Sequence, residues 1–169
     1  MKKSVTLIVC LAAVLMVLGH GNEKRTAEVT VKGKKISIDY FSPHLDGRDL
    51  FSLIKAGMEW RMGADAPTTL TTEADLSFGS VAVPKGSYTL VAKNIGPDQW
   101  TLIFSSDPQV RGTRRDAQKD VATVPLTAGK AEGTVEHMNI ELKPAGANAA
   151  RFSLAWGSTT LAASFTVSG

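Results

Sequence analysis

Apolar and polar residues alternate with a period of two along most of this chain. Ile36, Ile38 and Tyr40, for example, alternate with polar neighbours, which is typical of a strand with one buried face. The same pattern recurs to the C-terminus and is interrupted by glycine, proline and asparagine turns. It predicts strands at residues 28–31, 35–40, 70–78, 81–83, 88–92, 100–104, 121–126, 134–143, 151–156 and 161–167.

One segment departs from this period. Leu50, Leu53 and Ile54 recur at helical spacing, and Gly57 is suited to the left-handed position that ends a helix. We therefore expect one short helix over residues 48–56. A helix of this length is not stable in isolation, so it must pack on the sheet.

The number and spacing of these elements predict an all-β fold. The expected architecture is an antiparallel β-sandwich, or a flattened barrel, of about nine or ten short strands with one short helix. Trp100, Leu102 and Phe104 should share one face and be buried with Tyr88 and Leu90. Pro125 indicates that its strand lies at an edge, because proline cannot donate to a strand ladder.

The N-terminus has the three parts of a secretory signal peptide. Lys2 and Lys3 precede an apolar run over residues 5–18, and small residues follow. We expect a signal peptide at residues 1–21 and a single β-sandwich domain at residues 22–169. An uncleaved N-terminal anchor is the alternative. The protein is then exported to the periplasm or the extracellular space, with no membrane span after cleavage.

Charge and cysteine content narrow the function classes. The net charge is +3, and part of it belongs to the signal peptide, so it gives no argument for nucleic-acid binding. The one cysteine, Cys10, lies within the signal peptide, so no disulfide is expected. Arg111, Arg114 and Arg115 form a small basic patch, which we interpret as part of a solvated loop.

No catalytic or metal-binding motif is present. His44 and His137 are far apart in the sequence and have no ligand spacing, so we expect solvated or structural histidines and no metal or other cofactor. There is no Gly-x-Ser-x-Gly motif of a serine hydrolase. Glu59 and Asp65 are the one carboxylate pair that resembles a glycosidase pair, and such pairs are common.

The residues around Trp60 are the candidates for a binding site. A period of two over residues 58–62 predicts that Met58, Trp60 and Met62 share one face and that Glu59 and Arg61 share the other. The speculative ligand-binding set has an indole for stacking, arginines for an anion and polar partners for hydrogen bonds. Its members are Arg48, Glu59, Trp60, Arg61, Asp65 and Thr69. The structural alternative, which we favour, has Trp60 in the core. Arg61 is then mostly buried and bonded to a carboxylate, Glu59 or Asp65, or to backbone carbonyls of the following loop. Arg61 would then hold the loop at residues 63–69 onto the sandwich.

The order of several motifs adds a family resemblance. These motifs are Tyr40-x-Ser42-Pro43, Gly47-Arg48, Trp60-Arg61-x-Gly63-Ala64, Thr68-Thr69, Val83-Pro84-x-Gly86-x-Tyr88 and Leu154-x-Trp156-Gly157. Together they resemble the bacterial domain-of-unknown-function family numbered 2911. The resemblance spans residues 36–167 and implies an exported β-sandwich, but it supplies no activity.

Two function classes follow from the sequence. The first is a non-catalytic exported module that binds a small molecule, a glycan or an envelope protein. The second is a hydrolase-type enzyme with an unrecognised acid/base site around Glu59, Arg61 and Asp65. Such an enzyme requires these three side chains to converge on open space.

Overall fold

The computed structural model describes residues 21–49, 53–108 and 115–168 of the chain. These residues form a ten-stranded sheet and one 3-10 helix, η1 (Ala117–Lys119). The strands are β1 (Glu23–Val31), β2 (Lys34–Ser42), β3 (Glu59–Trp60), β4 (Thr69–Thr72), β5 (Leu76–Phe78), β6 (Val81–Val83), β7 (Gly86–Gly96), β8 (Gln99–Ser105), β9 (Asp120–Pro144) and β10 (Ala149–Val167).

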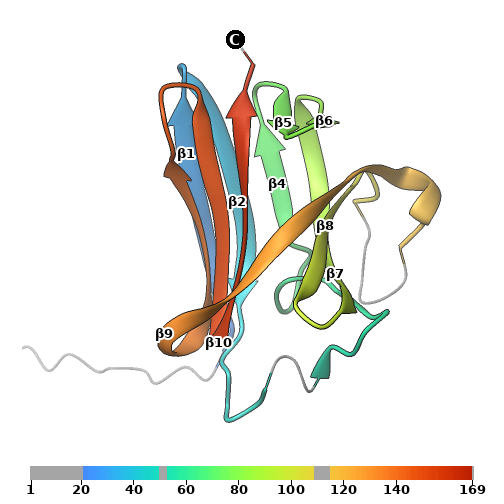
Figure 1. The fold of residues 1–169 in the computed structure, drawn as a ribbon, viewed down its shortest axis with the longest axis vertical. Coiled ribbons are helices and arrows are strands. Elements are labelled where there is room, and N and C mark those ends of the chain that lie inside the picture. Colours follow the sequence, from blue (N-terminus) through green and yellow to red (C-terminus); the bar gives the residue numbers. More distant parts are fainter. Residues whose placement is uncertain (1–20, 50–52, 109–114, 169) are drawn as a thin grey trace, which may run out of the picture.

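The sheet is antiparallel and not closed, as the sequence predicted for a sandwich. Its strand order is β1-β2-β4-β7-β8-β9-β10-β5-β6, and the short β3 pairs with β7 outside this path. In Figure 1, β9 crosses the front of the molecule diagonally, from the side of β7 and β8 to the side of β1 and β2. An isolated bridge between His44 and His137 also joins the segment after β2 to β9.

Two of the strands are much longer than the sequence pattern predicted. Each of β9 and β10 merges two expected strands, and the hairpin expected at Gly157 is a distortion inside β10. The pairing register shifts between Ala155 and Gly157 and again between Gly157 and Thr159. A positive φ of 60° at Gly157 allows this irregularity without a side-chain clash. Each long strand therefore takes part in both layers of the sandwich.

Other boundaries also differ from the prediction. The strand expected at residues 70–78 is divided into β4 and β5 by a short turn, in which the Thr72 hydroxyl donates to Ala74 O at 2.7 Å. Residues 121–126 pair with β8 alone in the described part of the sheet, so the edge position predicted from Pro125 is confirmed.

The predicted helix lies partly outside the described residues. Arg48 and Asp49 are not helical, and residues 50–52 are not described. The amide of Leu53 donates to Asp49 O at 3.2 Å, which is the spacing of one α-helical turn. Among the described residues, no helix is long and apolar enough to cross a membrane.

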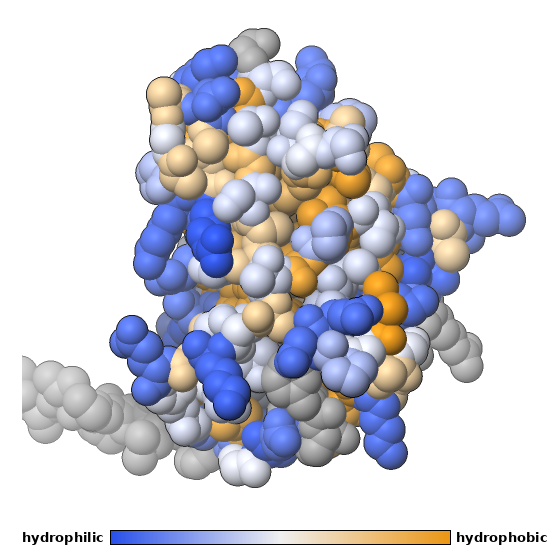
Figure 2. All heavy atoms as spheres, viewed as in Figure 1, coloured by the Kyte–Doolittle hydropathy of each residue, from blue (hydrophilic) through white to orange (hydrophobic). Residues whose placement is uncertain are grey.

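The core is one contiguous cluster with buried apolar residues from β1, β2 and β4 to β10. The predicted cluster of Trp100, Leu102, Phe104, Tyr88 and Leu90 is buried as expected. On the face shown in Figure 2, hydrophilic residues dominate the periphery and apolar residues gather in the middle. Val91 and Ile103 form a second, separate buried pair, because β7 and β8 are covered on both faces.

Candidate functional site

The chain leaves the sheet immediately after Trp60. Strand β3 contains Glu59 and Trp60 only, and Met62 then takes a positive φ of 56°. The expected alternation from residue 58 to residue 62 is therefore wrong beyond Trp60, and Arg61 does not share a face with Glu59. Met62 is fully buried, whereas Met58 is exposed. This turn decides which of the predicted site residues can meet.

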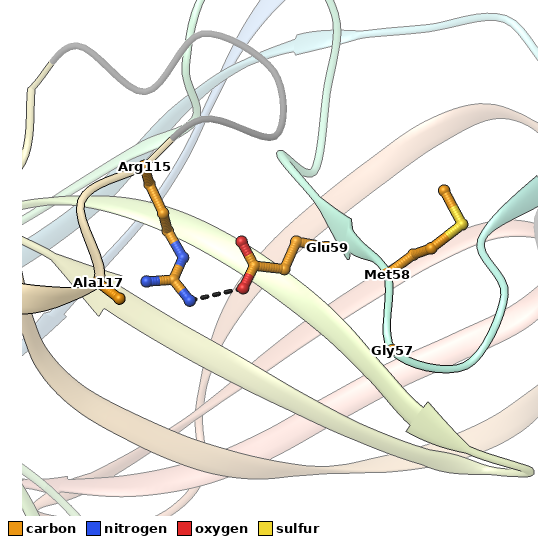
Figure 3. A pocket seen from close by; sticks show the side chains of 5 residues that line it. All are labelled: Gly57, Met58, Glu59, Arg115 and Ala117. Carbon is orange, nitrogen blue, oxygen red and sulfur yellow. Dashed lines mark hydrogen bonds and ion pairs between the residues drawn. The ribbon is translucent and has the colours of Figure 1, made fainter.

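Glu59 belongs to a partly buried ion network on the outer side of β7 (Figure 3). The Arg115 guanidinium donates to Glu59 Oε1 at 2.6 Å and to Asp120 Oδ2 at 2.5 Å. Only 8% of the Arg115 side chain is exposed. Lys93 lies 4.0 Å from the same Glu59 oxygen. We call Glu59, Arg115 and Asp120 the ion triad.

The electrostatics of the ion triad keep Arg115 charged. Burial alone disfavours the charged guanidinium, but hydrogen bonds and charge from Glu59 and Asp120 outweigh it, so the pKa of Arg115 is raised. The interpretation of Arg115 as a solvated loop residue is therefore wrong. Arg111 and Arg114, the other members of that basic patch, lie outside the described residues. In Figure 3 the Glu59 carboxylate and the Arg115 guanidinium are in direct contact, and both residues line a pocket of about 440 Å³.

Trp60 points toward the other side of the sheet, where it packs against the core. Its ring stacks on Trp156 of β10 with centroids 5.7 Å apart and an interplanar angle of 13°. The Arg48 guanidinium carbon lies 5.5 Å from the Trp156 ring centroid, within cation–π range. Trp156 thus contacts both Trp60 and Arg48, and these contacts bring together three separate segments of the chain.

These side chains line a pocket of about 260 Å³, which we call the arginine–tryptophan pocket. Its lining residues are Pro43, Arg48, Leu53, Ile54, Trp60, Arg61, Gly63, Ala64 and Trp156. Three of the six predicted site residues meet here. They are Arg48, Trp60 and Arg61.

The two arginines of this pocket differ in how firmly they are held. Arg48 donates through Nε to Leu45 O at 2.9 Å and through Nη2 to His44 O, and its Nη2 lies 3.7 Å from Asp46 Oδ2. Arg61 is half-buried and makes one weak hydrogen bond, from Nη1 to Asp65 O at 3.4 Å. No carboxylate of the described residues forms an ion pair with Arg61. Its charge is therefore available to a ligand.

The structure agrees with only part of the structural role expected for Arg61, because its hydrogen bond goes to a loop carbonyl and no carboxylate of the described residues pairs with it. The loop at residues 63–69 is held by Thr68, which is fully buried and donates to Met62 O at 2.7 Å. The amide of Ala64 also donates to Phe41 O at 3.1 Å. Gly63 packs so closely against Phe41 that a Cβ atom added to the glycine would lie only 3.0 Å from Phe41 O. Backbone contacts and Thr68 fasten the loop, and Arg61 lies at its surface.

Asp65 and Thr69 do not line the arginine–tryptophan pocket. Asp65 is exposed and accepts from the Asn22 side chain at 3.1 and 3.2 Å. Thr69 begins β4, where it pairs with Asp39 and Thr89. The Glu59 carboxylate thus bonds to Arg115 and the Asp65 carboxylate to Asn22, while Arg61 reaches only the backbone carbonyl of Asp65, so the three side chains do not form a common acid/base site.

A further cluster was missed by the sequence reasoning. His44 and His137 pair in the isolated bridge, and their rings lie 4.4 Å apart in an edge-on arrangement. His44 Nδ1 lies 2.9 Å from Asp46 Oδ1 and 2.9 Å from Glu136 Oε1. The signals present in the sequence are the pairs His44-x-Asp46 and Glu136-His137. Each pair is too common to indicate a site without knowledge of the bridge.

Trp156 is the second omission. The sequence reasoning used it only as part of a family motif, yet it is 4% exposed and forms the base of the tryptophan stack. Its indole Nε1 is buried without a hydrogen-bond partner among the described residues. Only the packing of β10 against β3 identifies this residue as part of a site.

Comparison with known proteins assigns the chain to a family. Residues 22–165 match the model of a family described as a protein of unknown function, DUF2911. Comparisons with curated proteins and with solved structures gave no significant match. The resemblance noted in the motifs is therefore confirmed over nearly the whole described chain, and the protein belongs to the DUF2911 family.

Proposed function

We propose that this protein is a non-catalytic binding module and that the arginine–tryptophan pocket is its ligand-binding site. The observation that carries the proposal is the Arg61 guanidinium, which has no carboxylate partner among the described residues and lies beside the stacked Trp60 and Trp156. A cation next to an aromatic stack is suited to a ligand with both an anionic group and a flat or apolar part.

The dimensions of the pocket indicate the size of this ligand. Sites for drug-sized molecules have volumes of roughly 300–1,000 Å³, and this pocket, with about 260 Å³, is slightly smaller than that range. A carboxylate or phosphate would pair with Arg61, while Trp60 and the exposed Leu53 would contact the rest of the molecule. An acidic sugar or a small aromatic acid has these properties. A neutral glycan or an envelope protein would depend less on Arg61.

The geometry gives less support to the enzyme alternative. Glu59 already accepts from Arg115 at 2.6 Å and lines a different pocket from Arg61. Asp65 is exposed and bonded to Asn22. A general acid or base must lie within hydrogen-bond reach of the reacting group, and these carboxylates do not share such a point with Arg61.

We also propose that the protein acts outside the cytoplasm. This proposal rests on Lys2, Lys3 and the apolar run at residues 5–18. Intact-mass analysis of the exported protein should give an N-terminus near Asn22. Retention of the full-length chain in the cytoplasm would contradict export, and exported protein that keeps residues 1–21 would favour the anchor.

Thermal-shift screening tests the binding proposal. The full chain is screened against small carboxylates, phosphates, acidic sugars and neutral sugars. A ligand at 100 times its Kd should raise Tm by roughly 5–10 °C. The shift should disappear in Arg61→Gln and persist in the matched control Arg151→Gln, because Arg151 is an exposed arginine outside the pocket.

Each result of this screen has a defined meaning. The proposal fails if no anionic ligand raises Tm, or if Arg61→Gln keeps the full shift. Selective stabilisation by neutral sugars, independent of Arg61, would assign the site to a glycan. Turnover of ester or glycoside substrates that is lost in Glu59→Gln would favour the enzyme alternative.

A further inference from the structure

The cluster at the His44–His137 bridge has a donor set that the proposed function does not use. It joins the segment after β2 to the second half of β9. One link between them is the hydrogen bond from Asp46 N to Glu136 Oε1 at 3.2 Å, which spans 90 positions of the sequence. The amide of Leu45 also donates to Glu136 O at 2.7 Å. The backbone thus holds residues 44–46 and 136 in a fixed relation. We call His44, Asp46 and Glu136 the bridge cluster.

The hydrogen-bond chemistry of His44 is incomplete in this arrangement. Two carboxylate oxygens, from Asp46 and Glu136, each lie 2.9 Å from His44 Nδ1. A ring nitrogen carries at most one hydrogen, so it cannot make a full hydrogen bond to both oxygens at once. The two carboxylates also repel each other. A cation that accepts a lone pair from all three atoms resolves both problems.

We propose that the bridge cluster is a binding site for a divalent transition-metal ion of the Zn²⁺ type. His44, Asp46 and Glu136 each offer one ligand atom, and these atoms lie within 4.8 Å of one another. The proposed ligands are His44 Nδ1 and the two oxygens at 2.9 Å from it, Asp46 Oδ1 and Glu136 Oε1. Zn²⁺ binds imidazole nitrogen at about 2.0–2.1 Å and carboxylate oxygen at about 2.0–2.2 Å. Two such ligand atoms at the tetrahedral angle are about 3.3 Å apart, so each observed nitrogen–oxygen distance of 2.9 Å would lengthen by about 0.4 Å on metal binding.

The choice of metal follows from the donors. Imidazole suits Zn²⁺, Ni²⁺ and Cu²⁺, whereas Mg²⁺ and Ca²⁺ take oxygen ligands. Zn²⁺ requires the neutral tautomer of His44 with its proton on Nε2. The His137 ring packs edge-on against His44 and limits its rotation. Arg48 Nη2 lies 3.7 Å from Asp46 Oδ2. This positive charge is therefore closer to Oδ2 than to Oδ1, the oxygen proposed to bind the metal.

The site has room for further ligands from solvent. His44, Asp46, Arg48 and His137 line a pocket of about 320 Å³. Three protein ligands leave at least one coordination position of Zn²⁺ for water or another small molecule. The bound ion would also clamp the segment after β2 onto β9. Metal binding should therefore raise the stability of the folded protein.

Calorimetric titration of the metal-free, untagged full chain with ZnCl₂ tests the proposal. We expect one saturable Zn²⁺ site per chain and no comparable binding of Mg²⁺ or Ca²⁺. His44→Gln and Glu136→Gln should weaken this binding by more than the roughly 10–100-fold cost of an outer-shell change. Glu141→Gln is the matched control on the same strand, and it should bind Zn²⁺ as the wild type does, because Glu141 pairs with Lys143 instead.

Imidazole ¹⁵N NMR provides the second readout. Zn²⁺ should shift the Nδ1 resonance of His44 and leave that of His137 less changed. The proposal is overturned if the wild type shows no saturable site, if both ligand variants bind Zn²⁺ as the wild type does, or if the His44 resonance does not move. The ligand side chains are all exposed, so the variants should remain folded, and circular dichroism verifies this.

Discussion

Arg115 and Arg61 show how differently two arginines of one small domain can be used. Arg115 has two carboxylate partners at 2.6 and 2.5 Å and is nearly buried. Arg61 is half-buried and has one weak bond to a carbonyl. Glu59 is two positions from Arg61 but belongs to the ion triad, because the strand ends between them. Proximity in the sequence therefore did not indicate which arginine has carboxylate partners and which has none among the described residues.

The comparison separates stabilising residues from candidate ligand contacts. Charges with oppositely charged partners, such as those of the ion triad, should control stability and should not affect ligand binding. Charges without an oppositely charged partner, such as that of Arg61, should affect ligand binding and have little effect on stability. The two stacked tryptophans differ in the same way, since Trp156 is buried and Trp60 is partly open to the pocket. The following predictions test this division from the largest expected effect to the smallest.

The largest effect should come from Trp156. Trp156→Ala removes a nearly fully buried ring and should lower the free energy of unfolding by roughly 3–5 kcal/mol. Trp60→Ala should cost less than half as much, because its ring is only partly buried. Urea unfolding monitored by far-UV circular dichroism measures both. Equal costs would show that Trp60 belongs to the core and contributes little open surface to the pocket.

Removal of Arg115 should have the next largest effect. Arg115→Met leaves Glu59 and Asp120 without their shared cation and should cost about 3 kcal/mol. This is the low end of the range for a broken buried pair, since both carboxylates remain about one-fifth exposed. Arg115→Lys should recover part of the loss, because it restores the charge but not the planar fork. Ligand binding at the arginine–tryptophan pocket should be retained in any fraction that folds.

Thr68 should have an intermediate effect. Thr68→Val removes the hydroxyl that donates to Met62 O and leaves this carbonyl unsatisfied in a buried position. We expect a loss of about 1–2 kcal/mol. Thr69→Val, at the half-buried neighbouring position, is the control and should cost less. Thermal unfolding of both variants measures the difference. An equal, small cost would mean that Thr68 does not fasten the loop.

Arg61 should have the smallest effect on stability. Arg61→Met should change the free energy of unfolding by less than about 1 kcal/mol, because it breaks no ion pair among the described residues. The same variant should lose the ligand that stabilises the wild type. A loss near that of Arg115→Met would instead restore the structural role that the sequence suggested for Arg61.

Strand periodicity predicted much of the fold from local sequence. The inward-facing Trp100, Leu102 and Phe104 and the edge position of Pro125 followed from alternation and from the chemistry of proline. The lengths of β9 and β10 did not. A glycine within a predicted strand is compatible with a turn or with a bulge. At Gly157 only the pairing of β10 with β9, with its register shifts, shows that the residue lies in a bulge of one continuous strand.

The candidate site was predicted only in part, for a related reason. Arg48, Trp60 and Arg61 were recognised as chemically suited to binding, and the structure brings them together. Asp65 and Thr69 were included because they are near in sequence, and they lie elsewhere. Trp156 was left out although it stacks on Trp60. Turn geometry at Met62 reversed the expected facing of Arg61, and isolated turns leave little periodic signal.

The sequence by itself determined the all-β class, most strand positions, the composition of the core and the family. These properties depend on a period of two and on local motifs, which a linear chain displays directly. Tertiary structure decided the partners of the charges. Arg115 meets Glu59 across 56 positions, and His44 meets Glu136 across the sheet. Such contacts depend on how strands that are distant in the sequence pack together, and the order of the residues does not by itself reveal this packing.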